Sequence, residues 1–257
     1  MDKIIVEKRL EVARHKEAVP LRWLLGHPAV SRKRISFREA LMASESGIIA
    51  EFKRKSPSRG WIHPEISPLE VVPRYEAGGA AAASILTDEP FFGGSLGDLA
   101  RTRPAVHLPL LRKDFIVDEY QLYQAKAMGA DFILLIAAAL TKGQVEAFAS
   151  LAHDLDLEVL LEVHTEEELE SVCGNVDVVG INNRNLKTFA TDVNTSFVLG
   201  GKISAGFPKI SESGLSDPET VRLLREAGFN GFLMGENFMK EKDPGAALAS
   251  FIERIKL

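Results

Sequence analysis

Charged side chains stand at the ends of several short apolar segments of this chain. Glu51 and Lys53 end one segment, Lys113 follows Leu111 in another, and Glu162 follows the leucines of a third. Side chains alternate along a β-strand, so Glu51 and Lys53, two positions apart, share a face. Burying such charges unpaired is costly, which predicts that they neutralise one another in a common site that can move protons.

Two further apolar segments end in polar residues of the same kind. "GINNR" places Gly180, Asn182 and Arg184 in phase, and "ISESG" presents Glu212 and Ser213. Taken alone, each of these residues is more simply interpreted as a solvent-exposed polar residue at the end of a strand. Their recurrence on several apolar segments favours a single site instead. The candidate catalytic residues from this pattern are Glu51, Lys53, Lys113, Glu162, Asn182 and Glu212, and the resemblance described below adds Ser213.

Two glycines near the C-terminus indicate a phosphate site. "SGL" and "MGEN" supply Gly214 and Gly235 directly after apolar runs, where the backbone can approach an anion closely. With Lys53 and Ser56 of "EFKRKSPS" on the other side, they predict a phosphate cradle. Glu236 is expected to turn its backbone, rather than its carboxylate, toward the anion.

The order of segments predicts the fold that would gather these residues. From residue 47 onward, β-rich runs alternate with amphipathic ones about eight times, as in a parallel barrel whose strands present their chemistry at their C-terminal ends. We predict a single-domain (β/α)8 barrel over residues 47–257, preceded by a helical extension over residues 1–46. A doubly wound open sheet is weakened by the number of units and by the absence of a G-x-G-x-x-G turn. The expected strand runs are GIIAEF, AAASILT, LPLLRKD, DFILLIA, LEVLLEVH, VDVVGINN, FPKISES and NGFLMG, and the fifth expected helix is TEEELESVCGN.

Composition restricts the class of protein. The 257 residues carry a net charge of −5, which gives no general attraction to nucleic acid or to an anionic membrane. The longest apolar run, residues 132–140, is too short to span a membrane, and the single cysteine, Cys173, excludes intramolecular disulfides. We expect a cytoplasmic monomer or weak homodimer, without nucleic-acid or membrane partners. The six scattered histidines predict no metal site, and no nucleotide-cofactor loop is visible.

Four residues near the predicted site receive separate expectations. Of the pair Phe91 and Phe92, one is expected to fill the core and the other to pack against a flat aromatic substrate. Arg54, out of phase with Lys53, is expected to face outward in a surface ion pair. His164 is also expected at the surface.

These segments together resemble the indole-3-glycerol phosphate synthase family. The resemblance runs in family order from about residue 47 to the C-terminus, and residues 1–46 resemble the extra helices of that family. The combination of "EFKRKSPS", "RKDF" and "ESG" is highly specific, whereas "MGENFM" departs mildly from the usual pattern. The matching segments are AEFKRKSPSRG, TDEPFFGGS, LLRKDFIVDEYQ, GADFILLI, LLEVHTEEEL, GINNRNL, ISESGL and FLMGENFM.

The resemblance implies a substrate and a division of roles. The substrate would be 1-(2-carboxyphenylamino)-1-deoxyribulose 5-phosphate, whose pyrrole ring closes with loss of carbon dioxide and water and without a cofactor. Lys113 would be the general acid at the C2′ oxygen, Glu162 the acid/base of the dehydration, and Lys53 a neighbour of the substrate carboxylate. In the remaining roles, Glu51 and Asn182 would orient reacting groups, Glu212 and Ser213 would support hydroxyls, Arg184 would lie near the carboxylate, and Phe92 and Leu186 would pack around the ring.

The chemistry of that reaction fits these residue types. Ring closure at an electron-rich carbon needs an electrophile strengthened by protonation, hence a lysine with a reactive pKa. Lys53 and Arg184 are expected to lower the pKa of Lys113, and Glu51 and Glu162 to oppose them. The alternatives are another phosphate-binding barrel enzyme, such as an isomerase or a Schiff-base aldolase, and a barrel that binds a phosphorylated ligand without turnover.

Overall fold

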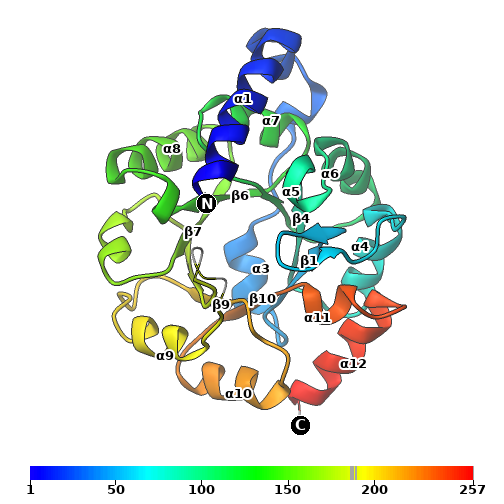
Figure 1. Cartoon of the computed structure of the whole chain (residues 1–257), viewed down its shortest axis with the longest axis vertical. Helices are drawn as coiled ribbons and strands as arrows, with labels where there is room; N and C mark the ends of the chain where they lie inside the picture. Colours follow the sequence, from blue (N-terminus) through cyan, green and yellow to red (C-terminus); the bar gives the residue numbers. More distant parts are fainter. Residues whose placement is uncertain (186–187, 189, 257) are drawn as a thin grey trace.

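Eight parallel strands close into a barrel, which confirms the predicted fold class. The computed structural model describes residues 1–185, 188 and 190–256. Going round the barrel, the order is β1-β10-β9-β8-β7-β6-β5-β4, so the first and last strands pair with each other (Figure 1). The barrel strands are β1 (Ile48–Phe52), β4 (Ala82–Leu86), β5 (Leu110–Lys113), β6 (Phe132–Ile136), β7 (Glu158–Val163), β8 (Val178–Asn182), β9 (Lys209–Glu212) and β10 (Gly231–Met234).

Helices cover the outside of the barrel between successive strands. Most lie where the amphipathic runs predict them, because those runs supply both an apolar face and capping residues; Thr141, for example, caps α8 in a capping box with Gln144. The helices of this layer are α4 (Pro68–Ala77), α6 (Leu96–Thr102), α7 (Tyr120–Ala127), α8 (Lys142–Asp154), α9 (Asn194–Gly200), α10 (Pro218–Glu226) and α12 (Pro244–Lys256). Short elements complete it: α5 (Glu89–Phe92), α11 (Glu236–Met239), η2 (Arg103–Ala105), η3 (Ala137–Ala139), η4 (Glu167–Ser171) and the hairpin β2 (Lys55–Ser56) and β3 (Gly60–Trp61).

The fifth connection differs from the expected α-helix. The segment predicted from "TEEELESVCGN" forms only the five-residue 3-10 helix η4. Four glutamates lie within five residues there, at positions 166, 167, 168 and 170. Like charges three and four residues apart repel on a helix surface, which disfavours a longer helix.

The first 46 residues form helices that reach both ends of the barrel. They are α1 (Asp2–Ala18), α2 (Leu21–Leu25), the 3-10 turn η1 (Pro28–Ser31) and α3 (Phe37–Ala43). Helix α3 closes the amino-terminal end of the barrel: Phe37 stacks on Phe132 at a centroid distance of 3.9 Å, and Leu41 packs among the barrel-interior side chains. Figure 1 shows α3 behind the barrel centre and α1 crossing the rim near β6 and α7.

Helix α1 is fixed to the opposite end of the barrel by a buried lysine. Lys8 Nζ lies 2.9 Å from carboxylate oxygens of Glu11, Asp88 and Asp114, and its side chain is fully buried. Asp88 and Asp114 follow β4 and β5, so this contact holds α1 against the carboxyl ends of the strands. No helix among residues 1–185 and 190–256 is long and apolar enough to cross a membrane.

Candidate active site

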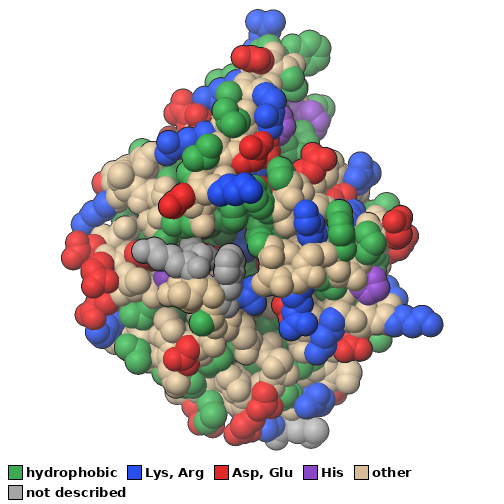
Figure 2. All heavy atoms as spheres, in the orientation of Figure 1, with side chains coloured by type: hydrophobic (Ala, Val, Ile, Leu, Met, Phe, Trp, Pro, Cys, Tyr) green, Lys and Arg blue, Asp and Glu red, His purple; other side chains and the backbone are tan. Residues whose placement is uncertain are grey.

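A cavity of about 390 Å³ opens at the carboxyl ends of the barrel strands. Figure 2 shows lysine and arginine side chains gathered around the hollow at the centre of this face. The predicted site residues that line the cavity are Glu51, Lys53, Phe92, Lys113, Glu162, Asn182, Arg184, Glu212, Ser213, Gly214, Gly235 and Glu236. Leu186, also predicted, lies outside the described residues. Ser56 is buried in the β2–β3 hairpin and does not line the cavity, whereas its neighbours Ser58 and Arg59 do.

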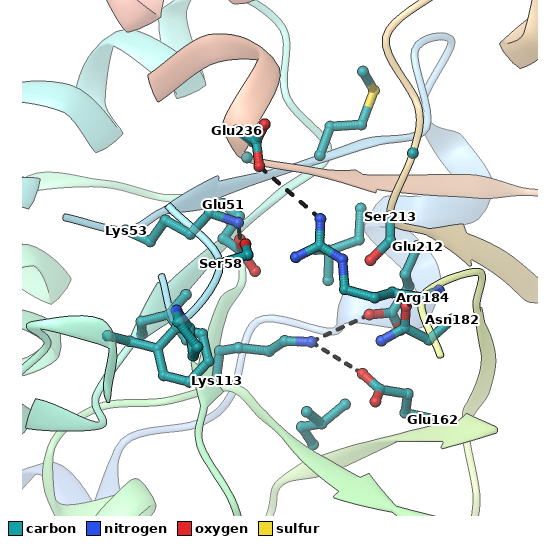
Figure 3. Close-up of a pocket in the computed structure, with 18 of the residues that line it drawn as sticks. Glu51, Lys53, Ser58, Lys113, Glu162, Asn182, Arg184, Glu212, Ser213 and Glu236 are labelled. Atoms are coloured by element: carbon teal, nitrogen blue, oxygen red, sulfur yellow. Dashed lines mark hydrogen bonds and ion pairs between the residues drawn. The ribbon is translucent and has the colours of Figure 1, made fainter. Parts of the chain in front are cut away.

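Lys113, on β5, stands between glutamates of two other strands, β7 and β9. Its Nζ donates to Glu162 Oε2 and to Glu212 Oε2, each at 3.2 Å (Figure 3). The strand register explains the convergence: Glu162 pairs with Gly180, and Asn182 pairs with Glu212. Lys113, Glu162, Asn182 and Glu212 lie at the carboxyl ends of parallel strands, so their side chains reach the same cavity.

Glu51 and Lys53 form a second charged pair in the same cavity. Lys53 Nζ donates to Glu51 Oε1 at 2.7 Å, which agrees with their predicted shared face. Gly235, on the adjacent strand end, makes room for this pair: a Cβ there would lie 2.7 Å from Glu51 Oε1. Gly180 does the same for Glu212, since a Cβ there would lie 2.3 Å from Glu212 Oε1. A side chain at either position would displace the neighbouring carboxylate.

The chain turns sharply at the end of β9. Ser213 has φ +68° and Gly214 has φ +77°, both in the left-handed region. Such a conformation is strained for serine and persists where the surroundings hold it. Asn183 provides that support, because its Nδ2 donates to the Ser213 carbonyl oxygen at 3.0 Å. The turn exposes the backbone of Ser213 and Gly214 to the cavity, beside the first turn of α11.

The aromatic part of the cavity lies beside Lys113. Phe92 and Phe115 are 6.2 Å apart between ring centroids and both line the cavity. Met1 and Ile4, at the start of α1, also line it, and no sequence pattern predicts that they do. Phe115 follows "RKD" directly and could have been found from that motif.

The mouth of the cavity carries a further group of charges. Arg59 Nε lies 2.8 Å from Glu236 Oε1, and Arg184 Nη2 lies 4.0 Å from Glu236 Oε2. The Glu236 carboxylate is therefore directed at two arginines. Lys240 lines the same cavity and was not anticipated from the sequence.

The charges around Lys113 determine which groups hold protons. Burial opposes the ammonium, but Glu212, Glu162 and Glu51 outweigh it and hold the pKa of Lys113 above its ordinary value. These carboxylates raise the pKa of Lys113, whereas Lys53 and Arg184 are expected from the sequence to lower it. Burial also opposes the Glu162 carboxylate, but Lys113 and His164 outweigh it, so the pKa of Glu162 is lowered. Burial and the charge of Glu162 raise the pKa of Glu212 to about 7.

Two expectations about residues near the site are wrong. Arg54 does face away from the cavity, but its ion pair with Asp98 is largely buried, because α6 and the loops around it cover that side of the strand. His164 is not at the surface: its side chain is only 10% exposed and lies between Glu162 and Glu168. The turn that begins η4 folds back over the end of β7 and encloses it.

Comparison with known proteins identifies the family. The model of the family described as indole-3-glycerol phosphate synthase matches residues 1–251. The chain belongs to this family. It is 54% identical over 257 residues to an indole-3-glycerol phosphate synthase of Bacteroides thetaiotaomicron, covering all of this chain and 98% of that one. It is 45% identical to the corresponding protein of Polaromonas sp., covering 97% and 96% of the two chains.

Solved structures of other proteins share the fold of this synthase-family chain. Tryptophan synthase subunit alpha from Legionella pneumophila superposes with a TM-score of 0.64 at 13% identity, covering 86% of this chain and 98% of that one. Thiamine phosphate pyrophosphorylase from Pyrococcus furiosus gives a TM-score of 0.61 at 16% identity, with the same coverages. At such identities the likeness concerns the barrel fold alone.

Proposed function

We propose that this protein is an indole-3-glycerol phosphate synthase. It would close the pyrrole ring of 1-(2-carboxyphenylamino)-1-deoxyribulose 5-phosphate with loss of carbon dioxide and water. The observation that carries the proposal is the buried ammonium of Lys113, 3.2 Å from both Glu162 and Glu212, in the cavity of a chain that belongs to this family.

The substrate would be held by its two ends and by its ring. The aromatic ring enters the apolar part of the cavity at Phe92 and Phe115, where flat faces can pack. The phosphate lies against the backbone of Ser213, Gly214 and Gly235, with Lys53 near the negative charges of the substrate. Arg184 is the candidate partner for the substrate carboxylate. Its guanidinium lies at the cavity mouth and contacts Glu236 only loosely, at 4.0 Å, so it can pair with a second carboxylate.

Lys113 would act as the acid of the ring closure. The ring carbon that bears the carboxylate attacks the C2′ carbonyl carbon, and the carbonyl oxygen takes a proton from the Lys113 ammonium. Carbon dioxide then leaves, and its bonding electrons restore the aromatic ring. Because the pKa of Lys113 is raised, the lysine enters the reaction fully protonated. Acid–base assistance of this kind contributes about 10²–10⁴ in rate.

Glu162 would serve the loss of water that follows. The ionised carboxylate accepts the proton released from the neighbouring carbon and passes it to the C2′ hydroxyl, which departs as water. The lowered pKa of Glu162 keeps this carboxylate ionised at neutral pH. Asn182 and Glu51 would orient the reacting groups, and Glu212 with Ser213 would contact substrate hydroxyls.

Incubation of the purified protein with the carboxyphenylaminodeoxyribulose phosphate tests the proposal. The indole product should appear in absorbance and fluorescence, and the absence of turnover by folded protein would refute the function. Borohydride added during turnover separates the Schiff-base alternative, since a covalent lysine adduct requires that mechanism. Binding of the substrate without any product would favour the non-catalytic alternative.

A further inference from the structure

We propose that His164, held by Glu168, is a positioning residue that keeps the Glu162 carboxylate ionised and oriented during the reaction. This inference rests on the role proposed above for Glu162. It concerns the second oxygen of that carboxylate, the one that Lys113 does not contact.

Glu162 is faced by one cationic group at each oxygen. Lys113 Nζ lies 3.2 Å from Oε2, as Figure 3 shows, and His164 Nε2 lies 3.3 Å from Oε1. His164 comes two residues after Glu162, directly past the end of β7, so the two side chains share a face of the extended chain.

The imidazole is fixed from its other side. His164 Nδ1 lies 3.3 Å from Glu168 Oε2, and the same oxygen accepts the backbone N–H of His164 at 2.7 Å. The backbone N–H of Glu168 in turn donates to Thr165 Oγ1 at 3.4 Å. A tight turn thus holds the ring with Nδ1 beside Glu168 and Nε2 beside Glu162.

The Nε2 atom is buried and has no aligned hydrogen-bond partner among the described residues. Burial removes water from this nitrogen, which is unfavourable unless a hydrogen-bond partner replaces the water. Glu162 Oε1, at 3.3 Å, is the oxygen placed to take that role.

The surroundings favour a charged imidazole. The charged groups that face it are Glu162 on β7, Glu168 on η4 and Glu212 on β9, all acidic. Burial opposes the charge, but these carboxylates outweigh it and raise the pKa of His164, while His164 helps to lower the pKa of Glu162. The ring and the carboxylate stabilise each other's charge.

This pairing has a consequence for the reaction sequence. When Lys113 gives its proton to the substrate, Glu162 loses the cation at Oε2. The imidazolium at Oε1 transfers no proton in that step and remains charged. Glu162 therefore stays ionised and can accept a proton in the following loss of water. A merely structural role, in which His164 only braces the turn 164–168, predicts no such effect on ionisation.

The test combines ring titration with a pH profile. His164 is titrated by NMR in the wild type, in Glu162→Gln and in Glu168→Gln, with its signal assigned by its loss in His164→Asn. Each glutamine variant should lower the pKa of the ring, whereas Glu170→Gln, which removes an exposed charge from the same segment, should leave it unchanged. In His164→Asn, the acidic limb of the kcat profile should move up by about one pH unit, equal to about 1.4 kcal/mol.

The outcomes are separable. A ring pKa that is the same in the wild type and in Glu162→Gln overturns the inference, whatever the enzyme does with substrate. An unchanged acidic limb in folded His164→Asn also overturns it. If the wild type shows no turnover, the proposed function fails, while the NMR titration still decides whether His164 and Glu162 are coupled.

Discussion

Two lysines of this protein, Lys8 fully buried and Lys113 only 13% exposed, each face several carboxylates in different surroundings. Lys8 contacts Glu11, Asp88 and Asp114 at 2.9 Å each; its own side chain is closed to solvent and does not line the cavity, although Asp114 does. Lys113 contacts two glutamates at the longer distance of 3.2 Å and lines the cavity.

The protonation of the carboxylates distinguishes the two clusters. Around Lys8, burial opposes the charge of Asp114, but Arg112 and Lys8 outweigh it. The pKa of Asp114 is therefore lowered, and its carboxylate stays ionised at neutral pH. Around Lys113, Glu212 has its pKa raised to about 7, and its Oε1 has no hydrogen-bond partner among the described residues. The first cluster has fixed charges and stabilises structure. The second has a carboxyl group that can change its charge near neutral pH, which suits proton transfer.

The largest expected effect comes from removing the cation of the second cluster. Lys113→Ala should reduce kcat by about 10²–10⁴, because the acid of the ring closure is lost. Substrate affinity should remain close to that of the wild type, since the contacts at the ring and phosphate are intact. Steady-state kinetics and substrate titration check the two parts separately, and near-normal turnover would remove Lys113 from the acid role.

Removing the cation of the first cluster should instead affect stability. Lys8→Met leaves three carboxylates facing one another around a buried site, and should lower the free energy of unfolding by about 3–5 kcal/mol. Urea denaturation measures the change. Lys3→Met, the same substitution at an exposed position of the same helix, is the matched control. Equal effects of the two substitutions would show that the Lys8 cluster does not anchor α1.

The ionisation of Glu212 should appear in the pH dependence of stability. Its folded pKa is raised, so the folded protein holds a proton that the unfolded chain releases at lower pH, and this contribution to stability is lost as pH rises through about 7. Glu212→Gln should therefore lose less stability than the wild type between pH 5 and 8. Urea midpoints measured across that range test this. Glu70→Gln, at an exposed carboxyl, should keep the wild-type slope, and an identical slope in Glu212→Gln would contradict the assignment.

The smallest effect is expected at a lysine–carboxylate pair on the surface. Lys16 lies 2.7 Å from Asp118, with the two side chains 45% and 32% exposed. Water screens such a pair, so Lys16→Gln should change the free energy of unfolding by less than about 1 kcal/mol. A loss comparable to that of Lys8→Met would show that exposure is not what separates these lysine pairs.

Much of the architecture followed from local patterns. The eight apolar runs correspond to the eight barrel strands, because a strand buried on both faces must be apolar over its whole length. The alternation of side chains placed Glu51 beside Lys53, as their 2.7 Å contact shows. The fifth helix is shorter than its amphipathic pattern predicts, because its four glutamates repel one another.

Other features depend on how the barrel closes. Lys113 reaches Glu162 and Glu212, 49 and 99 residues further along the chain, and only the strand order makes these residues neighbours. Gly235 was assigned to phosphate, yet its lack of a side chain also accommodates Glu51, because β10 returns to pair with β1.

Residue types and local periodicity were therefore sufficient to predict the strands, their faces and the kinds of side chain at their ends. They could not show that His164 turns inward, that Arg54 is covered, or that Met1 and Ile4 reach the cavity. Those facts depend on contacts between segments distant in sequence. A side chain's exposure and pKa are set by what packs over it, and only the folded chain brings those groups together.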